Sequence, residues 1–529
     1  MQDPNRWLLP ITTFLLGIAL ALFLGKKIQK NSFNKSPEKT KFSEILGYID
    51  NYYLDTVDKE KLFAGAVNGM LATLDPHSVY SSAEENKALM ESLGGGFDGI
   101  GVEFKIMNDT VMVVNTVSGG PSEQKGVRAG DRIVEVDGES IAGVGVTNDV
   151  VFKKLRGKKG TVVQVGIMRP GFKDIYRYKI KRNTIETHTL EVAYMIEPTV
   201  GYIKLNQFGE HTGYEFETAV KRLKNEGMTS LILDLRGNGG GYLGAAIEVC
   251  DAFLGNKELI VYTEGLRVKS DHIYATPLGC FEKGKLVVLI DDFSASASEI
   301  VAGAVQDNDR GAVVGRRSFG KGLVQQQFDL ADNSSLRLTV ARYHTPSGRC
   351  IQKKYDAGSE DYYEELYNRY LNGEMDNADS VKFDQSLKFK TKKGRTVYGG
   401  GGIMPDYFVP LDRDSNIVAF NQMYNTGLLI EFAFNYTNQH KAQLQKQYPD
   451  AKSFVKNMQV SDALAQEFIR FYANKEGKVT LNNASNKELR IWLKALIGRN
   501  LYRDEAFYPV INSTDKTVLK AVEVMKNDK

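Results

Sequence analysis

The chain of 529 residues contains few cysteines, few histidines and little net charge. Its three cysteines, Cys250, Cys280 and Cys350, lie far apart, include no CxxC pair and allow at most one internal disulfide. The six histidines are also scattered, so the two residue types give no spacing typical of a metal site. A net charge of +3, without a basic stripe containing aromatic residues, argues against nucleic acid as a partner. We therefore expect no metal, no cofactor and no disulfide framework.

One long stretch near the N-terminus has no charged residue. It runs from Trp7 to Gly25 and is long enough to span a bilayer. A cleaved signal peptide is the alternative, because Ala19-Leu20-Ala21 resembles a cleavage site, but the apolar run continues to Leu24 and favours an uncleaved anchor. The lysines that follow the run would keep the rest of the chain in the cytoplasm, although large domains cross membranes largely regardless of such charges.

The most informative stretch begins with the apolar segment Lys285 to Asp291, which has the length of a buried strand. Small residues follow from Ser294 to Ser298, and a helical pattern begins at Glu299. A serine at such a turn lies beside free backbone N–H groups, which could hold an oxyanion. The alternative is that Ser296 only caps the helix, since Ser296 and Glu299 fit a capping box. The residues alone do not choose among the three serines of this turn.

A lysine between two glycines, Lys321, follows this turn. It is either a solvated turn residue or the base of a Ser–Lys pair, a known variant of triad chemistry. The stretches FSASASEIVAGAVQD and SFGKGLVQ closely resemble the C-terminal processing peptidases, also called tail-specific proteases. This resemblance implies that Ser296 is the nucleophile and Lys321 the general base, supported by Gln325.

A glycine-rich loop, Gly237 to Gly244, follows the expected strand Ser230 to Arg236. Its second part, Gly239 to Gly244, satisfies GxGxxG before a helix, so a nucleotide-dependent enzyme is an alternative. The sequence LDLRGNGGG also resembles the loop that supplies an oxyanion donor in the same peptidase family. The resemblance assigns the oxyanion to the backbone N–H groups of Ala297 and of Gly240 or Gly241.

A segment of short alternating strands, Gly94 to about Arg182, resembles a PDZ domain. The sequence PSEQKGVRAGDRIVEVDG matches the core of such domains, and GIGVEF resembles their carboxylate-binding loop. The resemblance implies that this loop receives the C-terminus of a peptide through Gly99, Ile100, Gly101 and Val102. A plain β-turn is the alternative for these glycines.

Apolar residues at helical spacing predict two helices between Phe42 and Leu74, with a break near Asp55 to Asp58. The adjoining sequence GMLATLDPHSVY resembles the N-terminal region of the same family. A triad of Ser296 with His77 and Asp75 is an alternative. Beside a proline, however, His77 and Asp75 are better explained as stabilising a turn.

The expected fold is α+β and multidomain, with a PDZ β-domain inserted before an α/β serine peptidase core of the ClpP/crotonase type. A membrane helix and a helical segment precede these domains, and a helical C-terminal extension follows them. The expected boundaries are 1–30 for the cytoplasmic end and transmembrane anchor, 31–93 for the linker and helical segment, 94–185 for the PDZ domain, 186–410 for the peptidase core with an insertion at 353–397, and 411–529 for the extension of unknown role.

The sequence therefore predicts a membrane-anchored serine endopeptidase that cleaves proteins near their C-termini through an acyl-enzyme. Its expected partners are protein or peptide substrates with exposed C-termini and the membrane, with a homo-oligomer or an adaptor as a further expectation. The resemblance implies a single-pass protein of the cell membrane whose catalytic domain is extracytoplasmic, in the periplasm. If Ser296 only caps a helix, the alternative is a catalytically inactive, membrane-tethered PDZ scaffold.

Overall fold

The computed structural model describes residues 36–107, 109–117, 119–169, 172, 174–356, 358–412 and 415–527. The expected membrane helix, Trp7 to Gly25, lies outside the described residues. Among the helices that are described, none is long and apolar enough to cross a membrane. The chain divides into two compact units, Met1–Met70 and Leu71–Lys529, and each is described by itself.

The first unit contains the helices α2 (Pro37–Tyr52) and α3 (Lys59–Ala72), as the apolar spacing predicts. The side chain of Ser36 accepts a hydrogen bond from the Lys39 N–H and caps α2, and Pro37 occupies the first turn. None of the residues of α2 is buried. Local capping therefore contributes more to this helix than packing does.

An antiparallel sheet forms the β-rich domain that follows α4 (Ala83–Leu93). In pairing order its strands are β3 (Val102–Ile106), β4 (Val111–Thr116), β5 (Arg132–Val136), β7 (Val162–Met168) and β8 (Ile175–Lys181), while β6 (Glu139–Ser140) pairs with β5 and β2 (Gly96–Gly99) pairs with β9 (Asn183–Glu186). Alternate residues of β7 are buried, as expected for a strand with one face on a core. β3 is an edge strand, and α6 (Asn148–Leu155) lies beside it, where Phe152 meets Phe104 edge-on.

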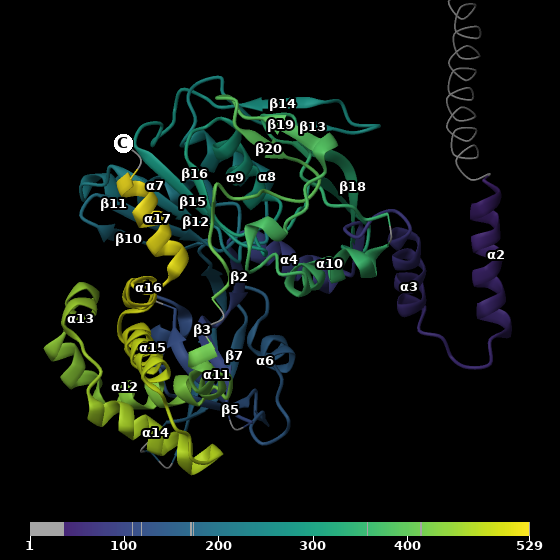
Figure 1. The fold of residues 1–529 in the computed structure, drawn as a ribbon. Helices are drawn as coiled ribbons and strands as arrows, with labels where there is room; N and C mark the ends of the chain where they lie inside the picture. Colours follow the sequence, from purple (N-terminus) through teal and green to yellow (C-terminus); the bar gives the residue numbers. More distant parts are fainter. Residues whose placement is uncertain are drawn as a thin grey trace, which may run out of the picture. The chain divides into compact units, whose positions relative to one another are not determined.

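A six-stranded sheet lies at the centre of the α/β part of the chain (Figure 1). In pairing order its strands are β10 (Leu190–Glu197), β11 (Val200–Leu205), β12 (Ser230–Asp234), β15 (Lys285–Ile290), β16 (Ala312–Gly315) and β21 (Tyr407–Phe408). Neighbours pair in parallel except β10 and β11. Strands β12 and β15 are apolar along most of their length, because parallel strands are buried on both faces.

Helices cover both faces of this sheet. They are α7 (Thr212–Asn225), α8 (Leu243–Asp251), α9 (Ala297–Asp307) and α17 (Lys516–Asn527). The first three share a core with Leu231, Leu233 and Val288. α17 packs on the opposite face, against Ile232 and Val287. The end of the expected extension, α17, thus packs on the central sheet. The apolar spacing of the extension does not predict this contact.

A second sheet lies beside the loop that contains Lys321. It consists of β1 (Val79–Ser81), β18 (Ser335–His344), β13 (Leu259–Glu264) and β14 (Asp271–Tyr274), and β17 (Leu323–Asp329) pairs with β18. β17 and β18 form a long antiparallel hairpin that starts two residues after Lys321. β1, which precedes the β-rich domain in the chain, pairs with β18 and so brings the N-terminal side of this unit to the hairpin.

The expected insertion at 353–397 contains one long helix and a small ribbon. Its elements are α10 (Ser359–Leu371), the 3-10 turns η2 (Ala378–Ser380) and η3 (Gln385–Leu387), and the strands β19 (Lys388–Lys390) and β20 (Thr396–Tyr398). Two residues of α10, Tyr362 and Arg369, are buried although both are polar. Seven positions separate them, so they share one face of the helix, and this face is the one that packs on the protein.

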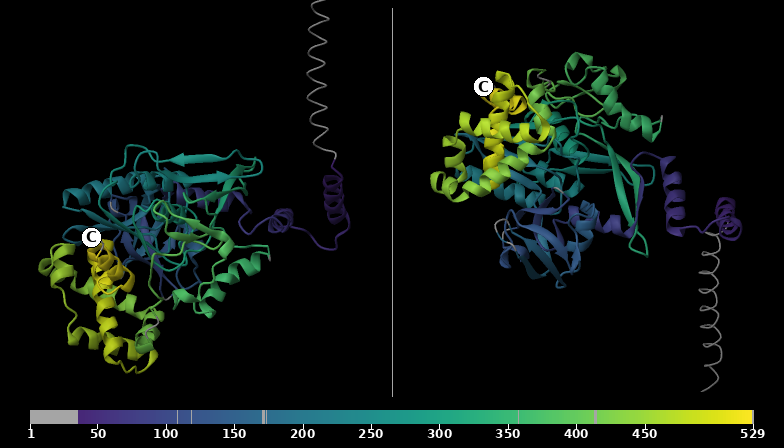
Figure 2. Two further views of the ribbon diagram at one scale, coloured as in Figure 1. Left: turned by 45° about the horizontal axis from the view of Figure 1, so that its top comes forward. Right: turned by 90° about the horizontal axis from the view of Figure 1, so that it is seen from below.

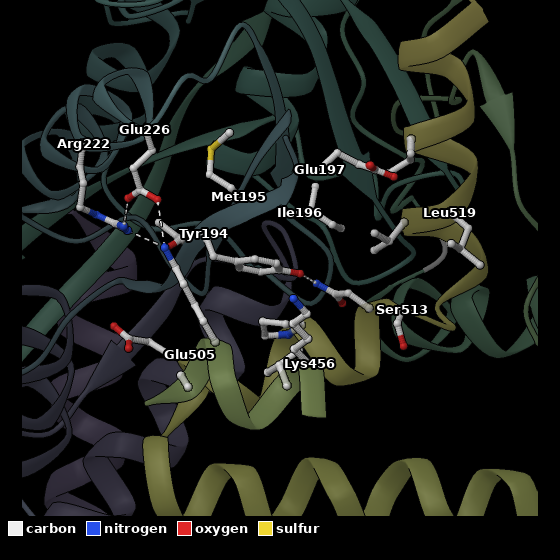
Figure 3. Close-up of a pocket in the computed structure, with 18 residues that line it drawn as sticks. Tyr194, Met195, Ile196, Glu197, Arg222, Glu226, Lys456, Glu505, Ser513 and Leu519 are labelled. Atoms are coloured by element: carbon white, nitrogen blue, oxygen red, sulfur yellow. Dashed lines mark hydrogen bonds and ion pairs between the residues drawn. The ribbon is translucent and has the colours of Figure 1, made fainter. Parts of the chain in front are cut away.

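Helices make up most of the expected extension, and they gather in one cluster in both views of Figure 2. They are η4 (Ser415–Ile417), α11 (Val418–Asn425), α12 (Leu428–Gln447), α13 (Ala451–Asn457), α14 (Asp462–Glu476), α15 (Asn483–Tyr502) and α16 (Asp504–Asn512). Their core, which includes Phe432, Phe468 and Leu493, is separate from that of the peptidase. A cavity of about 570 Å³ lies between α13, α16, α17 and β10 and contains none of the expected site residues (Figure 3).

Candidate active site

The turn between β15 and α9 places Ser296 directly before the helix. Its backbone has φ of 56° and ψ of −112°. A residue with a side chain pays about 1–3 kcal/mol for such a conformation, and surrounding contacts must hold it there. The nucleophiles of hydrolases lie on strand-to-helix turns with similar strain, although the GxSxG sequence is absent here.

The hydroxyl groups of the other two serines of the turn are hydrogen-bonded to the protein backbone. The hydroxyl of Ser294 donates to the carbonyl oxygen of Leu235 (2.8 Å), and that of Ser298 donates to the carbonyl oxygen of Asn238 (2.8 Å). Both residues are completely buried, whereas Ser296 is half-buried. Ser294 and Ser298 therefore hold the turn against the glycine-rich loop, which leaves Ser296 as the serine that a substrate could reach.

The buried carboxylate of Glu299 connects the serine turn, Ser294 to Ser298, to the lysine loop, Ser318 to Gly322. One oxygen accepts the N–H groups of Ser296 and Lys321 (both 2.8 Å). The other oxygen accepts the hydroxyl of Ser318 (2.6 Å) and the N–H of Gly320 (2.7 Å). Burial raises the pKa of Glu299 to about 7, against the effect of these hydrogen bonds. The contact with Ser296 is the one expected of a capping box, so capping and site geometry are compatible.

Lys321 is half-buried, and its amine donates to the Oε1 of Gln325 (3.4 Å). Burial lowers the pKa of Lys321 and the positive charge of Arg337 lowers it further, while Glu299 and Asp75 oppose this shift. The hydroxyl of Tyr343 lies within hydrogen-bonding distance of the carbonyl oxygens of Ser296 (3.2 Å) and Lys321. Tyr343 is thus a second link between the two loops.

Gln325 is held from the N-terminal side of the chain. Its amide nitrogen donates to the carbonyl oxygen of His77. The ring of His77 lies 2.9 Å from the hydroxyl of Tyr362, and burial together with the charge of Lys321 lowers the pKa of His77 to about 4. Asp75 accepts hydrogen bonds from the N–H of His77 (2.8 Å) and from the hydroxyl of Thr339 (2.9 Å). Asp75 and His77 therefore stabilise a turn, in which Asp75 bonds to the backbone of His77 and the ring of His77 contacts Tyr362.

The glycine-rich loop lies directly against the serine turn. A Cβ atom on Gly240, whose φ is +104°, would lie 2.8 Å from the Cβ of Ser296 and 3.1 Å from the nitrogen of Ala297. A side chain on Gly241 would collide with the backbone of Phe208. Only glycine permits this approach. These two glycines therefore let the loop approach both the serine turn and the backbone of Phe208.

The backbone N–H groups of the glycine-rich loop and of the start of α9 differ in whether they already donate a hydrogen bond within the protein. That of Gly240 donates to the side chain of Asn238 (2.9 Å), and the carbonyl oxygen of Asn238 accepts the N–H of Ala295 (3.1 Å). The bond to Asn238 makes Gly240 a poorer oxyanion donor than Gly241. Ala297 begins α9, where the first N–H groups have no partner within the helix.

The expected carboxylate-binding loop connects β2 to the edge strand β3. Gly101 has φ of +72°, and a Cβ atom there would lie 3.0 Å from Ile185. Ile100 is buried, and its carbonyl oxygen accepts the N–H (3.0 Å) and the hydroxyl (2.6 Å) of Ser122. The loop of Gly99, Ile100, Gly101 and Val102 therefore has a fixed shape beside a strand whose outer edge faces α6.

Metal-ligating residues do not gather in the part of the chain that the structure describes, where no group of three or more histidine, cysteine or acidic side chains could hold an ion. Cys250 is buried, and burial raises the pKa of its thiol. The free cysteines Cys250, Cys280 and Cys350 form no disulfide.

Comparison with protein families gives four matches along the chain. Peptidase family S41 matches residues 199–360 and the PDZ domain matches 99–187. The activating protease CtpB N-terminal domain matches 24–85, and a family of unknown function matches 419–504. The first three lie in the segments that resemble the C-terminal processing peptidases, and the fourth lies in the extension.

Curated proteins with similar sequences carry related names. The chain is 39% identical over 348 residues to the carboxy-terminal-processing protease of Bartonella bacilliformis, covering 64% of this chain and 79% of that protein. It is 32% identical over 442 residues to the carboxy-terminal processing protease CtpB of Bacillus subtilis, covering 81% of this chain and 89% of that protein. Among solved structures, a photosystem II D1 C-terminal processing protease is 30% identical, with 58% of this chain and 83% of that chain covered and a TM-score of 0.33.

Proposed function

This chain belongs to the carboxy-terminal processing proteases, serine-type peptidases of family S41 with a PDZ domain, and we propose that it is an endopeptidase acting through a Ser296–Lys321 dyad. The observation that carries the proposal is the carboxylate of Glu299, which binds the backbone N–H groups of both residues at 2.8 Å. This carboxylate fixes the strained serine relative to a half-buried lysine, an arrangement that a helix cap alone does not require.

The reaction begins when the hydroxyl of Ser296 attacks the scissile carbonyl carbon and the neutral amine of Lys321 takes its proton. The N–H groups of Ala297 and Gly241 stabilise the oxyanion. The ammonium of Lys321 then gives the proton to the leaving amine, and water hydrolyses the acyl-enzyme. An ordinary lysine, with a pKa of about 10.4, is almost fully protonated at pH 7. Burial, which lowers the pKa of Lys321, is therefore essential to its role as a base.

The PDZ domain supplies substrate binding at protein C-termini in this proposal. The fixed loop of Gly99 to Val102 offers backbone N–H groups to a terminal carboxylate, and the edge of β3 pairs with the preceding residues of the peptide. The ring of Phe152 on α6 meets Phe104 of β3 edge-on beside this strand. Cleavage near an exposed C-terminus follows from recognition of that end.

Membrane anchoring through Trp7 to Gly25 is also part of the proposal, supported by the absence of charge in that run. The catalytic domain would then lie outside the cytoplasm, in the periplasm. Fractionation of cells and protease accessibility of intact spheroplasts test both points. Recovery of the protein in the soluble fraction would contradict the anchor, and protection from added protease would contradict the orientation. A homo-oligomer or an adaptor remains an expected partner.

The dyad is tested by cleavage of an unfolded protein substrate by the purified chain. Ser296→Ala, Lys321→Ala and Lys321→Arg should each abolish cleavage, the last because arginine cannot act as a base in a protein. Lys354→Ala, at an exposed lysine, is the matched control and should keep full activity. Unchanged thermal unfolding of the variants shows that the fold is intact. Substantial cleavage by Ser296→Ala would contradict the proposal, and lack of cleavage by the wild type with intact peptide binding would favour the inactive scaffold.

A further inference from the structure

Arg337 lies on the hairpin that carries Gln325. In the register of β17 and β18, Gln325 is opposite Thr339 and Gln327 is opposite Arg337. Directly opposite residues share a face of a sheet, and so do residues two apart on one strand. The side chain of Arg337 therefore shares a face with Gln325, whose amide holds the amine of Lys321. The same face is bordered by the turn of Asp75, which bonds to Thr339.

The guanidinium of Arg337 has no acidic partner among the described residues. Its Nε is buried and forms no hydrogen bond within that part of the chain. Other arginines of the peptidase core are paired: Arg316 with Asp292 (2.7 Å), Arg349 with Asp307 (2.8 Å) and Arg369 with Glu365 (2.6 Å). A half-buried charge without a partner is costly, so this arginine is suited to a partner that is not part of the protein.

The positive charge of Arg337 also reaches the candidate base. After burial, it makes the largest contribution that lowers the pKa of Lys321. Arg337 thus places a positive charge beside the site, while the carboxylates nearby are already engaged: Glu299 by backbone N–H groups and Asp75 by Ser78 and Thr339. Such a region attracts a negatively charged group, and the planar guanidinium best matches a carboxylate.

We infer that Arg337 binds a carboxylate of the substrate chain close to the scissile bond and so determines part of the cleavage specificity. The inference rests on the proposed function, because it takes Ser296 and Lys321 as the place of cleavage. The carboxylate has two sources: the side chain of an aspartate or glutamate in the substrate, or the terminal carboxylate of a substrate that ends a few residues beyond the scissile bond. Both present the same chemistry to the guanidinium.

The test uses the purified full chain and one parent peptide in four forms, with Glu or Gln beside the scissile bond and with a free or amidated C-terminus. The kcat/KM of each form is measured for wild type, Arg337→Gln and Arg337→Lys. The matched control is Arg342→Gln, because Arg342 is an exposed arginine of the same strand that pairs opposite Leu323 and bonds to the hydroxyl of Tyr355 (3.1 Å).

The wild type should prefer one carboxylate by about 10- to 100-fold, the range expected of a charge-assisted hydrogen bond. Arg337→Gln should reduce this ratio to about 1, Arg337→Lys should keep part of it, and Arg342→Gln should keep all of it. A Glu-over-Gln ratio identifies the side chain as the source, and an acid-over-amide ratio identifies the terminus. The PDZ loop has the same sequence in all variants and could itself give a preference for a free C-terminus. Only the part of the preference that is lost in Arg337→Gln is therefore attributed to Arg337. If Arg337→Gln does not fold, the test uses Arg337→Lys in its place. A carboxylate preference in kcat/KM that is not reduced in Arg337→Lys would then overturn the inference.

Binding of the same peptides to Ser296→Ala, with and without Arg337→Gln, separates the two proposals. Fluorescence anisotropy should show a carboxylate preference in Kd that Arg337→Gln removes. A preference that survives Arg337→Gln in both binding and cleavage would overturn the inference and leave the dyad untouched. An Arg337-dependent preference in binding, with no cleavage by the wild type, would support the inference and contradict the proposed function.

Discussion

Glu299 binds four donors that belong to two loops, which makes it the residue on which the relative positions of Ser296 and Lys321 depend. The sequence indicated only its capping role, because a capping box is visible within four residues. The bonds to Ser318, Gly320 and Lys321 come from a separate loop, and no local pattern predicts them. Tyr343 and Arg337 were not predicted for the same reason: register between distant strands brings them to the site.

Glu299→Gln keeps the size of the side chain but points an amide NH₂ at N–H donors. We expect a loss of about 1–3 kcal/mol in the free energy of unfolding, typical of leaving buried donors unsatisfied, and a large loss of activity. The folded-state pKa of about 7 lies above the ordinary value of 4.5. As pH rises, the carboxyl group of Glu299 therefore loses its proton in the unfolded chain before it does so in the folded chain. The contribution of this group to the free energy of unfolding of the wild type falls between about pH 4.5 and 7.

Denaturant unfolding across this pH range measures the effect as the difference between wild type and Glu299→Gln, which cancels the other titrating groups. The difference should become smaller as pH rises. Glu364→Gln, at an exposed position in α10, is the control and should follow the wild type. A constant difference between wild type and Glu299→Gln would mean that Glu299 is ionised throughout and that burial does not govern its pKa.

Among the elements, α10 shows how an insertion can support a site. Arg369 donates to the carbonyl oxygens of Ser318 (2.7 Å) and Phe319 (3.1 Å), just before Lys321. Tyr362 lies 2.9 Å from the ring of His77, whose backbone holds Gln325. The sequence predicted an insertion at this place but no role for it, because a charged, tyrosine-rich segment gives no apolar spacing from which a packed face can be recognised.

Tyr362→Phe removes the hydroxyl that contacts the ring of His77 (2.9 Å) and accepts a hydrogen bond from Gln352 (3.4 Å). It should lower kcat about 2- to 10-fold while KM changes little, since a loss of about 0.5–1.5 kcal/mol in the contact with His77 acts on the position of Lys321. Arg369→Gln should have a larger effect, because two carbonyl oxygens lose a charged donor. The control is Tyr367→Phe, an exposed tyrosine of the same helix. Steady-state kinetics at several pH values provide the test, and a change in KM alone would show that α10 contacts substrate instead.

At the scale of the whole molecule, the peptidase core is closed by the end of the chain. α17 covers one face of the central sheet, and Asp515, just before it, pairs with Arg236 (2.8 Å). Arg236 also pairs with the buried Asp234 (2.6 Å) at the start of the glycine-rich loop. The resemblance of Pro121 to Gly138 identified the PDZ domain, and the apolar runs predicted the strands of the central sheet. They could not predict which of several amphipathic helices returns to the sheet, because any of them could cover it.

Met525→Ala should lower the free energy of unfolding by about 2–5 kcal/mol, as expected for truncation of a buried core side chain. Met525 is buried on α17 against the sheet. Leu519→Ala on the same helix is the control, because Leu519 is 49% exposed, and its effect should be within about 0.5 kcal/mol. Equal effects of the two substitutions in denaturant unfolding would mean that α17 does not pack on the core.

The place of α17 in the core has a consequence for the timing of activity. A chain that is still being synthesised lacks residues 516–527, so one face of the sheet is uncovered and Arg236 lacks its second carboxylate. The parts that hold Lys321 span the chain from Asp75 to Tyr362, and such distant contacts form late in folding. The central sheet is therefore fully covered only after residues 516–527 have been synthesised, which places completion of the site late in synthesis.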